Sequence, residues 1–244
     1  MLVALAILAI IAVLTFAHVA YWRRRFYVAT DYEHEQVLDT EDGCTIVLRR
    51  LPRPDGDIVG PPVLMVHGLC ANHRNNDLVP DHSLARHLRT RGRDVWLVTL
   101  RSGHPMRTWR ARNRVRFDHM VEHDLPLAVR EVLRHTSATQ LDYIGYSMGG
   151  MLMYAAIANP ELCQQLRRVV LVGAPPILRV PWLLRGVMHL GAWLPRSLVP
   201  TVHARFFATA FAFTSDLVFT PAHRLLAGER AAIRRGLMPQ AMAS

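Results

Sequence analysis

The feature that most constrains the fold is a G-x-S-x-G motif around Ser147, which joins a predicted strand to a predicted helix. Residues 140–146 are typical of a buried strand, and residues 147–158 are typical of a helix. A serine at such a junction occupies a strained turn that projects its hydroxyl beyond the sheet, while Gly145 and Gly149 let the neighbouring backbones approach closely. The motif therefore predicts an α/β fold with Ser147 at the carboxyl edge of a parallel sheet.

Strand and helix patterns alternate along the chain before and after this motif. Such alternation implies a doubly wound, mostly parallel sheet with right-handed crossovers. In one of the helices Pro126 is expected either to kink the helix or to mark a new start. The other predicted strands cover residues 35–39, 45–51, 63–66, 94–100 and 168–173, and the other predicted helices cover residues 81–91 and 117–135.

These patterns divide the chain into four segments. Residues 1–22 are expected to be a transmembrane signal anchor, and residues 23–60 to be lead-in strands and a loop. Residues 61–175 are expected to be the α/β core, and residues 176–244 a helical cap or lid without a clear buried strand. The apolar side chains of the cap either form a broad exposed surface or pack on the sheet.

The first 22 residues carry no charged side chain and are long enough for a membrane-spanning helix. Tyr21 and Trp22 stand where an interfacial aromatic belt is expected, and three arginines follow at residues 23–25. A cleaved signal peptide would carry its positive charges before the apolar run, so we expect an uncleaved anchor; the alternative is a cleaved or mis-started leader. The arginines predict that the rest of the chain lies on the cytoplasmic side.

The charge and the cysteines exclude several classes of protein. The formal net charge is +10 and every basic residue is an arginine, but no zinc-finger spacing, basic zipper or RNA-reading strand accompanies this charge. We therefore expect no nucleic-acid partner, and an anionic membrane surface suits the charge better. Cys44, Cys70 and Cys163 are too far apart for a structural zinc site or a disulfide framework, so no metal or cofactor is expected.

A second candidate element lies where the first buried strand ends, at His67 and Gly68. Because the carboxyl ends of parallel strands meet at one edge, this loop should lie beside Ser147. The backbone N–H groups of Leu69 and Met148 are then the natural pair of donors for an oxyanion hole. We expect His67 to be a structural histidine that braces the loop, not the catalytic base.

The chain resembles the α/β-hydrolase fold, and within that fold the acid lipase branch, which contains gastric and lysosomal lipases. The resemblance covers about residues 35–175 and implies that Ser147 is a nucleophile and that Leu69 and Met148 supply the oxyanion hole. The chain departs from those lipases at Tyr146 and Met148, where they usually carry His and Gln. The stretches that carry the resemblance are residues 66–76, 81–103, 108–113, 124–133 and 141–150.

A serine hydrolase also needs a base and an acid, which in this fold follow the serine in the order Asp then His, after two further strands. No such strand pattern follows residue 173. Asp216 and His223 occur in the required order but only seven residues apart, so they are candidates as acid and base, and the alternative is that they are surface or cap residues.

These features predict a membrane-anchored serine hydrolase that cleaves lipid-like or other acyl esters through an acyl-enzyme. Three alternatives stay open: an inactive protein of the same fold that binds a lipid or a partner, a fragment of a longer hydrolase, and acyl transfer to an acceptor other than water. Six arginines between residues 101 and 116 either bind anionic groups or form a solvated or salt-bridged face. The oligomeric state is not predicted.

Overall fold

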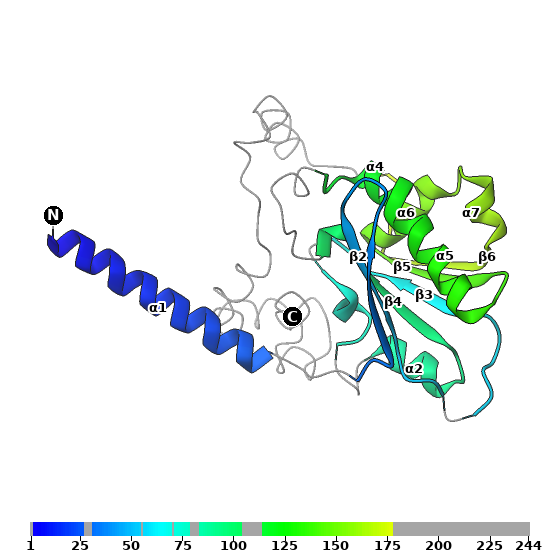
Figure 1. The fold of residues 1–244 in the computed structure, drawn as a ribbon, viewed down its shortest axis with the longest axis horizontal. Helices are drawn as coiled ribbons and strands as arrows, with labels where there is room; N and C mark the ends of the chain where they lie inside the picture. Colours follow the sequence, from blue (N-terminus) through cyan, green and yellow to red (C-terminus); the bar gives the residue numbers. More distant parts are fainter. Residues whose placement is uncertain are drawn as a thin grey trace. The chain divides into compact units, whose positions relative to one another are not determined.

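The computed structural model of this chain describes residues 2–26, 31–54, 56–69, 71–78, 83–103 and 114–177 (Figure 1). The N-terminal helix belongs to one compact unit, and the other described residues belong to a second. The predicted cap, residues 176–244, lies outside the described residues except for its first two positions, and so do Asp216 and His223.

The first unit contains the helix α1, Leu2–Phe26, whose apolar side chains, such as those of Leu8, Ile11 and Phe16, are exposed. Its side chains are described without a gap over residues 4–18, and no helix among the described residues is both long and apolar enough to cross a bilayer. The membrane anchor over residues 1–22 therefore stays a prediction.

The second unit contains a six-stranded sheet in the order β1-β2-β4-β3-β5-β6. The two outer pairs β1–β2 and β2–β4 are antiparallel, while β4, β3, β5 and β6 run parallel, so the prediction of a mostly parallel sheet is confirmed. The strands are β1 His34–Asp39, β2 Thr45–Arg50, β3 Val63–Val66, β4 Val95–Thr99, β5 Leu141–Tyr146 and β6 Leu166–Val172.

Some of the helical segments that connect the strands begin at residues whose side chains cap them. Ser83 accepts a hydrogen bond from the Arg86 N–H at the start of α2, and Asn159 caps α7 by accepting from the Leu162 N–H. The helices are η1 His73–Asn75, α2 Leu84–Thr90, η3 Arg101–Gly103, α4 Phe117–His119, η4 Met120–Asp124, α5 Leu125–Thr136, α6 Met148–Ala156 and α7 Pro160–Gln164.

Pro126 marks a new helix start, which was one of the two predicted outcomes. A proline lacks the N–H that a helix interior needs, so it fits in the first turn of α5, Leu125–Thr136. The segment η4, Met120–Asp124, just before it is a π-helical turn, an irregularity that the spacing of apolar residues did not predict.

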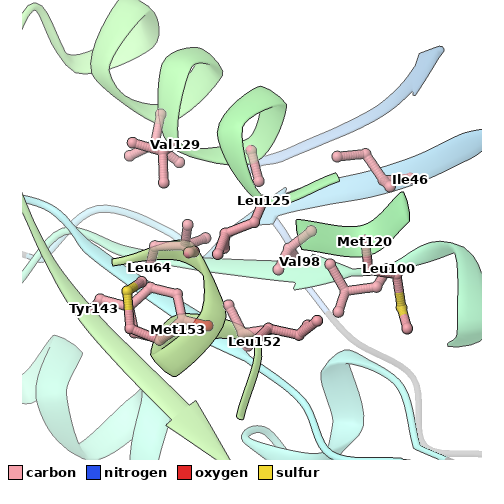
Figure 2. Close-up of a cluster of buried hydrophobic side chains, with 14 of the residues drawn as sticks. Ile46, Leu64, Val98, Leu100, Met120, Leu125, Val129, Tyr143, Leu152 and Met153 are labelled. Atoms are coloured by element: carbon pink, nitrogen blue, oxygen red, sulfur yellow. The ribbon is translucent and has the colours of Figure 1, made fainter. Parts of the chain in front are cut away.

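The core lies on both faces of the parallel strands. Leu64 and Val66 of β3 pack with α5 and α6 on one face, as Figure 2 shows for Leu64. Val63 and Met65 of the same strand pack with Ala85 of α2 on the other. Because both faces are covered, β3 is a continuous apolar run with no polar alternation.

The strand β6 lies at the edge of the described part of the sheet. It begins at Leu166, two residues before the predicted position, and it follows the helix α7, which the sequence analysis missed. Its central residues Val169 and Val170 are 40% and 51% exposed. Leu166 and Leu171 of the same strand pack against the core, so β6 is only partly covered within the described part of the chain.

Candidate active site

The pairing of three strands assembles the candidate site. Val66, the last residue of β3, is in register with Val98 of β4 and with Gly145 of β5. The segments that leave these three strands, beginning at His67, Leu100 and Ser147, therefore emerge side by side at the carboxyl edge of the sheet.

Ser147 adopts the strained conformation that the motif predicts. Its φ of 47° and ψ of −110° are unfavourable for a residue with a side chain, and the residue is exposed. The Ser147 N–H donates to the Val172 carbonyl at 2.9 Å, and its own carbonyl accepts from the Met151 N–H at 3.0 Å. The turn is thus fixed on one side by β6 and on the other by the first turn of α6.

Glycines are required because backbone passes close to the turn on two sides. A Cβ at Gly145 would lie 2.7 Å from the Gly150 nitrogen, and a Cβ at Gly149 would lie 2.6 Å from the Val66 carbonyl oxygen. The buried Tyr143 hydroxyl donates to the Gly149 carbonyl at 2.6 Å. The start of α6 is therefore locked against the end of β3.

His67 is completely buried and uses both ring nitrogens. The Leu100 N–H donates to Nε2 at 3.0 Å, so Nε2 must be the unprotonated nitrogen and Nδ1 carries the proton that it donates to the Gly68 carbonyl at 2.8 Å. Burial lowers the pKa of His67 to about 4. A neutral imidazole with both nitrogens bonded braces the loop and has no free nitrogen to accept the Ser147 proton.

The two predicted oxyanion donors stand on segments that meet at the serine. A Cβ at Gly68 would lie 3.3 Å from the Ser147 Cβ, so the loop after β3 passes directly beside the turn. Leu69 follows in that loop with an exposed side chain. Met148 is the first residue of α6, so its N–H has no acceptor within the helix. The oxyanion role of Leu69 and Met148 stays a prediction.

Two polar groups that support this loop were missed in the sequence. Asn75 Oδ1 accepts from the Gly68 N–H at 3.0 Å, and Arg101 is fully buried between Asp42 and Asp124. An arginine in a basic stretch gives no sign of burial, so only the fold could locate Arg101. Of the six arginines considered above, Arg101 is salt-bridged inside the protein and Arg116 pairs with Asp118 at the surface.

No proton acceptor is hydrogen-bonded to the Ser147 hydroxyl among the described residues. Neither a histidine nor a carboxylate within them hydrogen-bonds to its hydroxyl. Asp216 and His223, the candidate acid and base, lie outside the described residues, so their roles are untested. In the same described ranges, no group of three His, Cys, Asp or Glu side chains could hold a metal ion.

The sequence model of the α/β hydrolase fold matches residues 61–227. Human gastric triacylglycerol lipase is 31% identical over 166 residues, which are 61% of this chain and 39% of that protein. Human lysosomal acid lipase/cholesteryl ester hydrolase is 28% identical over 182 residues, which are 68% of this chain and 44% of that protein. The chain thus spans about two fifths of the length of these relatives.

A solved structure agrees with the fold. The thioesterase domain from the curacin biosynthetic pathway superposes with a TM-score of 0.53 at 16% identity, covering 85% of this chain and 64% of that one. At this level of identity the likeness concerns the fold alone.

We expect Gly149→Ala to destabilise the protein by about 1–3 kcal/mol, the usual cost of overpacking. The added methyl would meet two backbone oxygens, those of Val66 and His67, which cannot move aside as a flexible side chain can. Gly56→Ala is the matched control, because a Cβ at Gly56 has no heavy atom within 4 Å. Denaturant unfolding followed by circular dichroism measures both; equal stability of the two variants would show that the contact at Gly149 is not tight.

The buried neutral state of His67 predicts a pH dependence of stability. Its pKa is about 4 in the folded protein and about 6.5 when unfolded. The unfolded chain therefore takes up the proton first, and the free energy of unfolding should fall by up to about 3 kcal/mol from this residue as the pH drops from about 6.5 to about 4. The side chain of His67→Gln cannot titrate, so the free energy of unfolding of this variant should fall by about 3 kcal/mol less than that of wild type over the same pH range. If the free energies of unfolding of wild type and His67→Gln fall in parallel as the pH drops, the prediction is wrong.

Proposed function

Because the chain belongs to the α/β hydrolase fold family, we propose that it is a serine hydrolase that cleaves acyl esters with Ser147 as the nucleophile. The observation that carries the proposal is the conformation of Ser147 itself. The residue is strained, exposed and followed at once by the N-terminus of α6. A structural serine at the start of a helix would need no such strain, whereas a nucleophile does.

In the proposed reaction the Ser147 hydroxyl attacks the ester carbonyl carbon while a base takes its proton. The negative charge that develops on the carbonyl oxygen is stabilised by the N–H groups of Leu69 and Met148. The C–O bond to the alcohol then breaks and the alcohol leaves with a proton, which gives an acyl-enzyme; water hydrolyses it and returns the proton to Ser147. Asp216 and His223 are the candidates for the acid and the base.

The proposed substrate class is lipid-like acyl esters. It is supported by the names of the relatives, a triacylglycerol lipase and a cholesteryl ester hydrolase, although they match this chain over only part of their length. The apolar sequence of the cap segment, residues 176–244, suits a cover for an acyl chain.

A second function is favoured by a different observation. No hydrogen bond joins the Ser147 hydroxyl to a histidine or a carboxylate of the described residues, and a serine that has no base loses most of its reactivity. On this alternative the chain binds a lipid or a partner and catalyses nothing. Reactivity of Ser147 separates the two functions.

We also propose that residues 1–22 anchor the chain in a membrane with the hydrolase unit on the cytoplasmic side. The uncharged apolar sequence and the arginines at residues 23–25 support this. An arginine in place of Leu8 or of Ile11 should cost about 3 kcal/mol of insertion free energy at the centre of a membrane helix. The variant that carries both substitutions should therefore be released from membranes on alkaline carbonate extraction. Full-length chain that is extracted as readily as the double variant would refute the anchor.

The nucleophile is tested by labelling the full-length protein with a fluorophosphonate probe, which reacts with activated serines. We expect stoichiometric labelling at Ser147 and at least a hundredfold slower labelling of Ser147→Ala. Ser137→Ala is a matched control, because Ser137 is the other described residue with a side chain and a positive φ, and it lies at the end of α5. A folded wild-type protein that labels no faster than Ser147→Ala would favour the binding function.

A further inference from the structure

A buried ion cluster joins three segments that are distant in the sequence. Arg101, in the η3 turn that follows β4, is fully buried between two carboxylates. Asp124 of η4 accepts from Arg101 Nε at 2.8 Å and from Nη2 at 2.6 Å. Asp42, in the turn between β1 and β2, accepts from Arg101 Nη1 at 2.5 Å and from Nη2 at 2.9 Å. The guanidinium therefore holds two carboxylates, one on each side.

The cluster also fixes the backbone of η3. The Arg101 N–H donates to Asp124 Oδ2 at 3.0 Å, so Asp124 holds both the side chain and the main chain of the same residue. Asp42 is held in turn by the Thr40 hydroxyl at 2.6 Å and lies 3.1 Å from His119 Nδ1. Burial acts to raise the pKa of Asp42, but the hydrogen bonds from Arg101 and Thr40 outweigh it and hold that pKa well below its usual value.

The η3 turn packs directly against the loop that carries the candidate oxyanion donor. The Leu100 N–H, immediately before Arg101, donates to His67 Nε2. Gly103, at the end of the turn, lies so close that a Cβ there would be 3.1 Å from His67 Nε2 and 2.6 Å from the Ala71 carbonyl oxygen. A shift of the backbone at Arg101 would therefore move His67.

His67 in turn sets the direction of the Leu69 N–H. Its Nδ1–H donates to the Gly68 carbonyl, which belongs to the same peptide group as the Leu69 N–H. A trans peptide is planar with its C=O and N–H pointing in opposite directions, so holding the carbonyl oxygen fixes where the N–H points. Asn75 Oδ1 holds the preceding Gly68 N–H, which leaves this peptide little freedom to rotate.

We propose that Arg101, clamped by Asp42 and Asp124, is a positioning residue that aims the Leu69 N–H at the oxyanion through His67. The inference rests on the proposed function, because it assigns the purpose of the cluster to that same site. It explains why a costly buried ion cluster stands beside the turn after β4, where an apolar side chain would fill the space without desolvating charges.

The proposal is tested with Asp42→Asn, because Asp124 still pairs with Arg101 in this variant and should keep the fold intact. Asp94→Asn is the matched control: Asp94 forms a buried two-pronged pair with Arg50, at 2.7 and 2.8 Å, but lies before the amino end of β4, away from the loop. Loss of an oxyanion donor costs about a hundredfold to a thousandfold in kcat, so a misaimed donor should cost ~10-fold. With a soluble acyl ester as substrate, we expect Asp42→Asn to show this loss of kcat with a KM within twofold of wild type. The kcat of Asp94→Asn should be unchanged, and the kcat of Asp42→Glu should lie between those of Asp42→Asn and wild type.

A measurement that needs no turnover keeps this inference separate from the proposed function. In protein labelled with ¹⁵N-leucine, the Leu69 amide signal, assigned by its absence in Leu69→Ile, should shift in Asp42→Asn and stay in place in Asp94→Asn. If wild type does not react with esters or the probe, the proposed function fails, and the amide shift still decides whether Arg101 sets the peptide. An unmoved Leu69 amide, or an unchanged kcat in folded Asp42→Asn while wild type is active, would overturn the inference. If Asp42→Asn does not fold, Asp42→Glu takes its place, with a smaller shift expected.

Discussion

The contact between the first turn of α6 and the end of β3 is the constraint on which the site depends. Gly149 lies against the carbonyl oxygens of Val66 and His67, and a Cβ at this position would lie 2.6 and 2.9 Å from them. The turn between β5 and α6 contains Ser147 with a positive φ. The same contact brings the loop after β3 to the side of the serine, which makes one site from two segments that are 80 residues apart, His67 and Ser147.

A second layer of polar groups holds this loop in one conformation. His67 is neutral and bonded on both nitrogens, and Asn75 holds the Gly68 N–H. Behind His67, the Arg101 cluster ties η3 to the π-helical turn η4 and to the β1–β2 turn. Each of these groups is buried or half-buried. The charges of Arg101 and Asp124 therefore fix the backbone of η3, which packs against the loop beside Ser147.

The sequence predicted the parts of the fold that apolar runs and turn residues determine. The strand β3 was found at the expected residues because a strand covered on both faces is continuously apolar, and β5 was found within one residue of its expected start, directly before the motif around Ser147. The helix α7 was missed because five residues are too few for a helical period, although Asn159 before Pro160 was a usable start signal. The cluster of Arg101, Asp42 and Asp124 could not be predicted, since its members meet only through the order of the strands. The acid and base stay untested, because Asp216 and His223 lie outside the described residues.

If Ser147 is a nucleophile toward acyl esters, an acyl group must be attached to it during the reaction. The most direct measurement is the intact mass of the full-length protein, quenched in acid within milliseconds to seconds of mixing with an activated acyl ester. We expect a protein heavier by one acyl group in place of one hydrogen, with the modification on the peptide that contains Ser147, and no such species in Ser147→Ala. A folded wild-type protein that never carries the acyl group, or an adduct that persists in Ser147→Ala, would contradict this role of Ser147.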